Sequence, residues 1–391
     1  MGRRALGGFG SRAAGRVSIA IIVVASAAAL YQLVAIVAAL SHRRRDSYPV
    51  ELGASVAPAI IPVSILKPVH GRDAGFYEAI RTHALQQYPK FEILFGIRRA
   101  DDPARADLER LIREYPAIPI RVVLCATPAP NLKVGSLIDL ARQARYPILI
   151  VNDSDISVPP DYIRDVTAPL MDRDIGLVTC LYRAEVDDWP SLFEALAIAT
   201  DFAPSTLVAR MFGVSDFGLG STLAFRATDL DRMGGFQAIA DYIADDYQLG
   251  SRLHSLGMRN VISEVVVSTR LSAESWLGAW LHQVRWARTI RLSGGNAAYA
   301  GLPITYASLW VVVAALFGLW WVALPLLAIR LAMAITCAWF LLGASDVWKY
   351  CYAIPLRDLL GVAVWGAGLG GHAVVWRDQK LELDGEGKIV G

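Results

Sequence analysis

Short apolar segments alternate with amphipathic segments along residues 59–268, and this alternation constrains the fold more than any other feature of the chain. Strands separated by helices build βαβ units, and such units form a parallel sheet with helices on its faces. We therefore expect an α/β domain with a mostly parallel sheet. The expected strands are Ile61–Pro68, Phe91–Ile97, Ile120–Leu124, Ile148–Val151 and Gly176–Cys180. The expected intervening helices are Gly75–Gln87, Pro103–Tyr115 and Val134–Ala144.

The segment Ile148–Val158 places acidic residues at the end of a strand that is apolar throughout. Such a strand is typically covered on both faces, and open α/β sheets bind ligands at the carboxyl ends of their strands. Asp153 and Asp155 stand at that end. Two carboxylates one residue apart suit a divalent cation that keeps positions open for phosphate oxygens. The alternative is that Asp-Ser-Asp only turns the chain, as these residue types commonly do.

Two further acidic pairs occur in the same part of the sequence. Asp101-Asp102 closes the strand Phe91–Ile97, so we expect it to face the same crevice as Asp153 and Asp155. Asp245-Asp246 opens a predicted helix. The helix dipole alone favours acidic residues in a first turn, but this explains one aspartate better than two in succession.

Long apolar segments predict a membrane protein. Hydrophobic residues make up 54% of the 391 residues, which is too many for one soluble domain of this length. Val17–Leu40 is long enough to cross a bilayer, and we expect an uncleaved anchor. Ile304–Ile329 and Leu360–Trp376 are further candidate spans. The shorter Leu331–Gly343 is expected to be a tilted helix or one arm of a hairpin.

The segment Glu274–Leu292 interleaves tryptophans with arginines. A helix of this composition suits the headgroup layer of a membrane. The alternative is a helix that packs on the core and exposes a basic face to solvent. The basic residues of the chain form neither a tail nor a repeated stripe, so we expect no nucleic-acid partner.

Several short motifs, in a fixed order, carry a family resemblance. They are Ile65-Leu66-Lys67-Pro68 with Gly71, Asp101-Asp102-Pro103-Ala104, Asp153-Ser154-Asp155, Ala244-Asp245-Asp246-Tyr247 and His282-Gln283-Val284-Arg285-Trp286. On these residues the chain resembles membrane-bound glycosyltransferases of families 2 and 21. It is most similar to the ceramide glucosyltransferase family, including bacterial relatives that glycosylate hopanoids. His282 departs from the family pattern, which has Gln or Arg there.

The resemblance implies a GT-A (nucleotide-diphospho-sugar transferase) fold and a role for each motif. Asp153 and Asp155 would hold Mg²⁺ or Mn²⁺, with Asp155 the more direct ligand. Asp246 would be the catalytic base of an inverting reaction. The remaining expected contacts are Asp102, Lys67 and Lys133 around the nucleotide of a UDP-sugar, and His282, Arg285 and Trp286 at the diphosphate or the lipid acceptor.

The resemblance also implies a domain order and a reaction. We expect a transmembrane anchor and basic linker (1–58), a GT-A domain (59–272), an interfacial amphipathic helix (273–300), transmembrane helices (301–376) and a polar tail (377–391). The charges around the first span conflict, but Arg43–Arg45 favour a catalytic domain facing the cytoplasm, and the Ala- and Arg-rich composition favours a bacterial inner membrane.

The expected reaction is transfer of one glucose or N-acetylglucosamine from a UDP-sugar to a hydroxyl of a membrane lipid, either ceramide or a hopanoid. Two alternatives stay open. One is a processive membrane polysaccharide synthase, and the other is a non-catalytic UDP-sugar-binding membrane protein.

Overall fold

The computed structural model describes residues 6–45, 61–271, 275–344, 349–376 and 379–390. The chain divides into two compact units, and each is described by itself. The first unit comprises Met1–Ser41, Leu196–Val208 and His282–Gly371. The second comprises His42–Ala195, Ala209–Leu281 and His372–Gly391.

The second unit is built on an eight-stranded sheet with the strand order β3-β2-β1-β4-β7-β6-β8-β5. The first four strands pair in parallel, as do β6 and β8, whereas β7 runs antiparallel to both of its neighbours. The prediction of an α/β fold with a mostly parallel sheet is confirmed. The strands are β1 (Val63–Pro68), β2 (Phe91–Ile97), β3 (Ile120–Leu124), β4 (Ile148–Val151), β5 (Ile156–Ser157), β6 (Ile175–Val186), β7 (Leu223–Arg226) and β8 (Arg259–Leu271).

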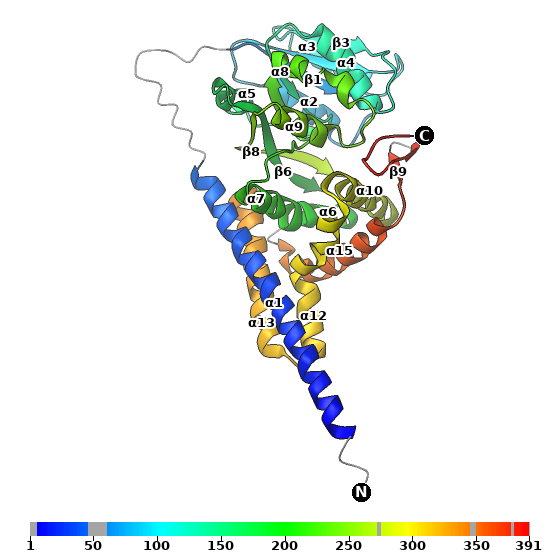
Figure 1. Cartoon of the computed structure of the whole chain (residues 1–391). Helices are drawn as coiled ribbons and strands as arrows, with labels where there is room; N and C mark the ends of the chain where they lie inside the picture. The colour runs from blue at the N-terminus through cyan, green and yellow to red at the C-terminus, as the bar shows by residue number, and fades with distance from the viewer. Residues whose placement is uncertain (1–5, 46–60, 272–274, 345–348, 377–378, 391) are drawn as a thin grey trace. The chain divides into compact units, whose positions relative to one another are not determined.

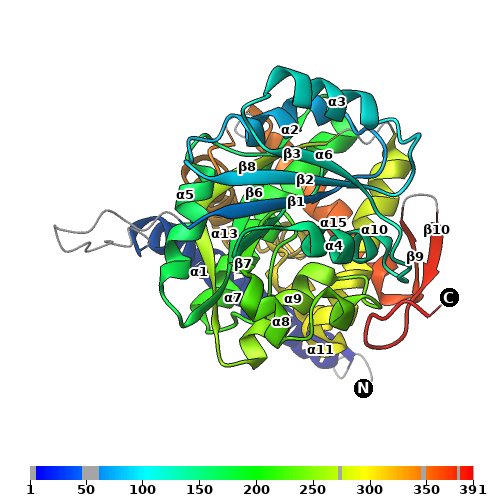
Figure 2. The same ribbon diagram turned by 90° about the horizontal axis from the view of Figure 1, so that it is seen from above.

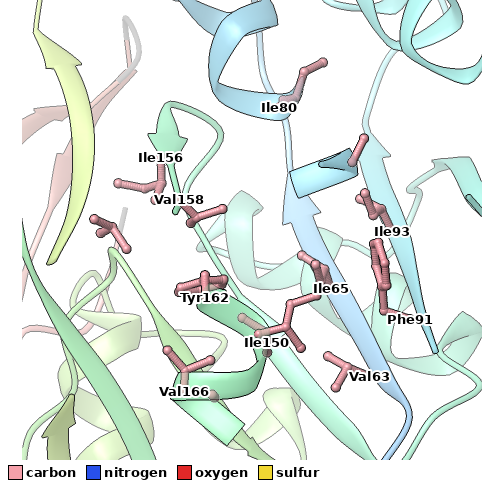
Figure 3. Packing of buried hydrophobic residues seen from close by; sticks show 14 of the residues in the cluster. Val63, Ile65, Ile80, Phe91, Ile93, Ile150, Ile156, Val158, Tyr162 and Val166 are labelled. Atoms are coloured by element: carbon pink, nitrogen blue, oxygen red, sulfur yellow. The ribbon is translucent and has the colours of Figure 1, made fainter. Parts of the chain in front are cut away.

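Alternation along the central strands supplies a separate core to each face of this sheet. Ile65 faces one core and Leu66 the other, because successive side chains of a strand point to opposite faces. The first core, shown in Figure 3, is covered by α2 (Phe76–Ala84), α3 (Arg105–Glu114) and α5 (Tyr162–Thr167). The second is covered by α4 (Leu132–Gln143), α8 (Ala227–Arg232) and α9 (Asp245–Ser255), as Figure 2 shows for α4 and α9. The sheet is therefore buried on both faces, and its strand ends are where side chains can meet a ligand.

The first unit is helical, and the chain contains three helices long and apolar enough to cross a membrane among its described residues. They span Gly15–Arg43, Trp189–Met211 and Trp320–Leu341. Within this unit α1 (Leu6–Arg45) packs small residues such as Ala25 and Ala28 against α12 (Ala307–Leu316) and α13 (Trp320–Ile335) (Figure 1). The predicted membrane character and the first predicted span are confirmed.

The prediction of a single span over Ile304–Ile329 is wrong. A break at Gly318 separates α12 from α13, because Gly318 adopts a left-handed φ of 73° and Leu319 N donates to the carbonyl of Ala314. The residues on both sides of Gly318 are apolar, so hydropathy alone does not reveal the break. The predicted short helix Leu331–Gly343 is instead the second half of the candidate span Trp320–Leu341, which runs through Arg330.

The predicted span Leu360–Trp376 is also wrong in its bounds. The helix there is α15 (Ile354–Leu369), and it ends before Gly370-Gly371, where Gly371 has a φ of 78°. Beyond it β9 (Ala373–Trp376) pairs antiparallel with β10 (Gln379–Glu382), so the described part of the predicted polar tail includes one arm of a hairpin. The predicted domain boundaries at 58/59 and 272/273 lie outside the described residues.

The remaining helices carry the other predicted segments. The amphipathic segment is helical, as α10 (Trp276–Gly294), and α11 (Asn296–Gly301) follows it. The apolar segment Trp189–Met211 consists of α6 (Trp189–Ala197), a π-helical stretch (Ile198–Phe202) and α7 (Ala203–Met211).

Candidate active site

The turn after β4 presents Asp153 and Asp155 at the carboxyl end of the parallel strands. Asn152, which is buried at the start of this turn, holds it in place. Its amide nitrogen donates to the hydroxyl of Tyr162 at 2.8 Å and to the carbonyl of Ser221 at 2.7 Å. Lys67 supports the same turn from β1, because its ammonium donates to the carbonyl of Asp153 at 2.9 Å. Asn152 and Lys67 are buried, whereas Asp153 and Asp155 are partly exposed.

Lys133 joins the aspartate turn to the acidic start of α9. Its ammonium lies 2.9 Å from Oδ1 of Asp153 and 3.0 Å from Oδ2 of Asp245. Burial opposes the charge of Lys133, but Asp153 and Asp245 outweigh it and raise the pKa of the ammonium. The structure thus brings together two of the predicted acidic motifs, with a permanent positive charge between them.

Asp246, next to Asp245 in the chain, is held by backbone amides and not by Lys133. Its Oδ2 accepts a hydrogen bond from the amide of Gly220 at 2.8 Å, and its Oδ1 accepts one from its neighbour Tyr247 at 2.8 Å. A Cβ atom built on Gly220 would lie 3.2 Å from Oδ2 of Asp153 and 3.2 Å from Oδ2 of Asp246. The lack of a side chain at position 220 therefore lets the carboxylates of Asp153 and Asp246 both approach this point of the backbone.

The surroundings of Asp246 suit a proton acceptor. Burial, and then the neighbouring charge of Asp245, raise the pKa of Asp246 to about 6, while Lys133 pulls in the opposite direction. A base is most effective when its pKa lies near the working pH. At neutral pH this carboxylate is therefore ionised, yet more basic than an exposed aspartate.

Asp155 is the second carboxylate of the turn, and it accepts a short hydrogen bond from the hydroxyl of Thr269 on β8. Burial, and then the charge of Asp153, raise its pKa. Within the described residues no group of three or more His, Cys, Asp or Glu side chains is arranged to hold a metal ion. Two carboxylates still fit Mg²⁺ or Mn²⁺, because such ions often take one or two carboxylates and fill their other positions with water and substrate phosphate.

Two predicted nucleotide contacts already have structural partners. Asp102 accepts hydrogen bonds from the amides of Gly71, at 3.1 Å and 3.2 Å, and of Ala104 at 2.9 Å, so it ties the loop after β1 to the start of α3. Lys67 is wholly buried beside His83, and burial lowers its pKa to about 7. Direct contact between Lys67 and a nucleotide is not supported by this position, because the residue lies on a strand covered on both faces.

The residues predicted for the diphosphate or acceptor lie on α10. The ring centres of His282 and Trp286 lie 5.0 Å apart, and the ring centre of Phe202 lies 6.4 Å from that of Trp286. All three of His282, Arg285 and Trp286 belong to the first unit, whereas the aspartates belong to the second. Their part in donor or acceptor binding stays a prediction.

Sequence reasoning assigned no role to Gly220 or Thr269. Gly220 lies in the run Gly218-Leu219-Gly220 before β7, and two closely spaced glycines next to a strand are a signal for close approach of other groups. Thr269 gave no such signal, because a threonine in a strand is ordinary. Only the pairing of β5 with β8 brings it to Asp155.

Comparisons with known proteins show the family to which the chain belongs. The profile described as Glycosyl transferase family 21 matches residues 17–389. Ceramide glucosyltransferase 1 of Caenorhabditis elegans is 30% identical over 210 residues, which cover 53% of this chain and 45% of the relative. Ceramide glucosyltransferase 3 of the same organism is 29% identical over 231 residues, covering 58% and 50% respectively. The chain spans about half the length of these curated relatives.

The fold also has a counterpart among solved structures. A mannosyltransferase from Pyrobaculum calidifontis, in complex with GDP-Man and Mn²⁺, superimposes with a TM-score of 0.51 at 19% identity. The match covers 89% of this chain and 96% of the mannosyltransferase. At this identity the likeness concerns the fold.

Proposed function

Because this chain belongs to glycosyl transferase family 21, we propose that it is an inverting glycosyltransferase that moves one sugar from a UDP-sugar to a hydroxyl of a membrane lipid. The observation that carries the proposal is the setting of Asp246. Its carboxylate is held by two backbone amides, lies with the Asp153 carboxylate beside Gly220, and has a raised pKa. A base so placed, next to a turn that would bind the diphosphate through a metal ion, suits direct displacement at a sugar carbon.

In the proposed reaction the lipid hydroxyl attacks the anomeric carbon of the donor. Asp246 accepts the hydroxyl proton while the new carbon–oxygen bond forms. The bond between the anomeric carbon and the diphosphate breaks at the same time, and the nucleotide diphosphate leaves with the electron pair. Attack opposite the leaving group inverts the configuration, so an α-linked donor gives a β-glycoside.

The departing diphosphate requires positive charge. Asp153 and Asp155 would hold Mg²⁺ or Mn²⁺, which supplies Lewis-acid stabilisation of the leaving group when bound. The Mn²⁺ present in the Pyrobaculum mannosyltransferase complex supports this choice of cofactor. Lys133 would hold Asp153 in place through its ion pair, and it keeps the acidic cluster from repelling an anionic donor.

Relatives and composition support a lipid acceptor. The two nematode relatives are named ceramide glucosyltransferases, so ceramide with UDP-glucose is the first pair to test. Hopanoids with UDP-N-acetylglucosamine are the second pair, proposed from the resemblance to bacterial hopanoid glycosyltransferases. The three candidate spans and the exposed Trp276 and Leu277 of α10 would keep the enzyme at a bilayer that contains such acceptors.

The deciding experiment is transfer by the purified full chain in lipid nanodiscs. Ceramide or bacteriohopanetetrol is supplied with UDP-glucose or UDP-N-acetylglucosamine and Mn²⁺, and the lipids are analysed by mass spectrometry. We expect one added sugar per lipid with the wild type and none with Asp246→Asn. Asp231→Asn, an exposed carboxylate in the same unit, serves as the matched control and should retain activity.

Other outcomes would replace the proposal. Products with a ladder of added sugars would indicate the processive synthase. UDP-sugar binding by calorimetry with no transfer to any acceptor would indicate a non-catalytic binding protein.

A further inference from the structure

Residues 379–390, here called the strap, fold back onto the loop that precedes the two aspartates of α9. That loop, Ala240–Ala244, is here called the base loop. The carbonyl of Gly387 accepts a hydrogen bond from Ile243 N at 3.1 Å, and Ile389 N donates to the carbonyl of Asp241 at 2.7 Å. The ammonium of Lys388 stands 5.4 Å from the centre of the Tyr242 ring. Sheet-like bonding therefore joins the strap to the base loop next to Asp245 and Asp246.

The opposite edge of the base loop is bonded to Asn131. The backbone amide of Asn131 donates to the carbonyl of Ala240 at 3.0 Å, and its side-chain amide donates to the carbonyl of Tyr242 at 2.8 Å. The side-chain oxygen of Asn131 also caps α4, accepting from the amides of Lys133 and Val134 at 3.0 Å and 3.2 Å. The base loop is thus fixed between the strap and the first turn of the helix that carries Lys133.

The shape of the strap depends on a turn between Asp384 and Lys388. Oδ1 of Asp384 accepts from the amides of Glu386 and Lys388, at 2.8 Å and 2.9 Å. Gly387 is buried and adopts a φ of 78°, in the left-handed region. A residue with a branched Cβ is strongly disfavoured there, whereas Asn tolerates it. Gly387 is therefore the point at which one substitution can displace the strap.

We propose that the strap is a positioning element for the reaction, with Asp384 and Gly387 as its positioning residues. It fixes the base loop, and through that loop the orientation of the first turn of α9 on which Asp246 lies. None of its residues needs to touch the substrate. The inference rests on the proposed role of Asp246 as the base. Displacement of a reacting group by about 1 Å can cost about a hundredfold in rate, so a loosened base loop should lower kcat.

The test compares two glycines of the same turn. Gly387→Val forces a branched residue into a left-handed backbone, while Gly387→Asn is the more conservative variant because Asn tolerates this φ. Gly385→Val is the matched control, because a Cβ atom at Gly385 meets no atom within 4 Å. Two readouts are taken on the full chain in nanodiscs: amide hydrogen exchange of peptides covering residues 241–247, and the separate values of kcat and KM for the UDP-sugar.

The expected result is faster exchange in residues 241–247 and a kcat at least tenfold lower for Gly387→Val, with KM changed less than threefold. Gly385→Val should match the wild type in both readouts, because a Cβ atom there meets nothing within 4 Å. Gly387→Asn tolerates the left-handed backbone but adds a side chain at a buried position, so it should fall between the wild type and Gly387→Val. Unchanged exchange and kcat in a folded Gly387→Val protein would overturn the inference. If that variant does not fold, Asp384→Ala decides by the same two measurements. Wild-type protein without transferase activity would refute the proposed function, and the exchange data would still decide whether the strap orders the base loop.

Discussion

The ammonium of Lys133 lies 2.9 Å from Oδ1 of Asp153, with only 14% of the lysine side chain exposed. The same ammonium contacts Asp245 at 3.0 Å. One cation therefore balances the two acidic motifs that flank the candidate site. In its absence three nearby carboxylates, those of Asp153, Asp245 and Asp246, would repel one another and the donor.

Substituting Lys133 by Met should impair both folding stability and catalysis. It leaves Asp153 and Asp245 without their cation, and we expect a loss of roughly 2 kcal/mol in unfolding free energy, less than for a fully buried pair because Asp153 is 43% exposed. Transfer should fall at least tenfold. Lys133→Arg keeps the charge and should lose less. Denaturant unfolding and transfer assays measure the two effects, and equal behaviour of the Met and Arg variants would contradict the charge argument.

The pH dependence of transfer should report Asp246. The base must be deprotonated, and its pKa is raised to about 6, so kcat/KM should fall as pH drops through and below 6. Lys133 lowers this pKa, so Lys133→Met should move the acid limb to higher pH. Rate profiles between pH 4.5 and 8 with saturating Mn²⁺ measure this. An acid limb that does not move in Lys133→Met would argue against Asp246 as the group observed.

Removing the divalent cation should abolish transfer reversibly. Chelation by EDTA should eliminate activity, and Mn²⁺ or Mg²⁺ should restore it, because Asp153 and Asp155 offer the carboxylates that such ions take. Asp155→Asn should raise the Mn²⁺ concentration needed for half-maximal activity at least tenfold. Thr269→Val removes the hydroxyl that donates to Asp155 and should produce a smaller shift. Full activity in a chelated, metal-free sample would refute metal dependence.

Gly220→Ala should lower activity without unfolding the protein. The added methyl group would lie 3.2 Å from carboxylate oxygens of both Asp153 and Asp246, which must then move apart. These atoms are the ends of side chains, so the fold can accommodate the change while the site is distorted. We expect kcat to fall about tenfold and the melting temperature to change little. Gly385→Ala is the control, and similar kcat values for both variants would show that the space at Gly220 is unimportant.

The sequence predicted the strands that run parallel at the centre of the sheet more accurately than the elements around them. Phe91–Ile97, Ile120–Leu124 and Ile148–Val151 match β2, β3 and β4 in both bounds. Such strands can be predicted without knowing which strands they pair with, because each is a continuous apolar run closed by polar residues. The antiparallel insertion of β7 between β4 and β6 was not predicted, because pairing across long sequence separations leaves no local pattern.

The sequence predicted which acidic residues come together, but it predicted the burial and the contacts of the neighbouring residues less well. Asp153, Asp245 and Asp246 do lie in one cluster, since their positions at element ends follow from the alternation of strands and helices. The burial of Lys67 could not be foreseen, because a lysine beside a proline at a strand end is usually exposed. The hairpin of β9 and β10 was missed because Ala373–Trp376 continues an apolar run that otherwise reads as helix.

A buried ionic network in the first unit leads to the last prediction. Arg330 of α13 is 2% exposed and donates to both carboxylate oxygens of Asp358 on α15, at 2.9 Å and 2.6 Å. It also contacts Asp201 at 3.0 Å and the carbonyl of Thr200 at 2.8 Å. Arg357 pairs with the other oxygen of Asp201. Two arginines and two aspartates thus balance within apolar helices.

Arg330→Met should destabilise the protein strongly, because it leaves the buried Asp358 and the half-buried Asp201 with one cation between them. Loss of one partner of a buried pair costs about 3–5 kcal/mol. Arg99→Met breaks a pair with Asp101 in which the two side chains are 72% and 70% exposed. It is the control and should leave the unfolding temperature nearly unchanged, because solvent screens an exposed pair. Thermal unfolding of the detergent-solubilised protein measures both.

The double variant Arg330→Met with Asp358→Leu separates charge from packing. It removes one charge of each sign and leaves Arg357 paired with Asp201, so the network stays neutral. If the uncompensated charge causes the destabilisation, the double variant should be more stable than Arg330→Met, since apolar replacement of a buried pair is often neutral. If the double variant is less stable than the single one, Asp358 contributes through its hydrogen bonds, including the one from Ser308 at 2.5 Å, and the charge explanation fails.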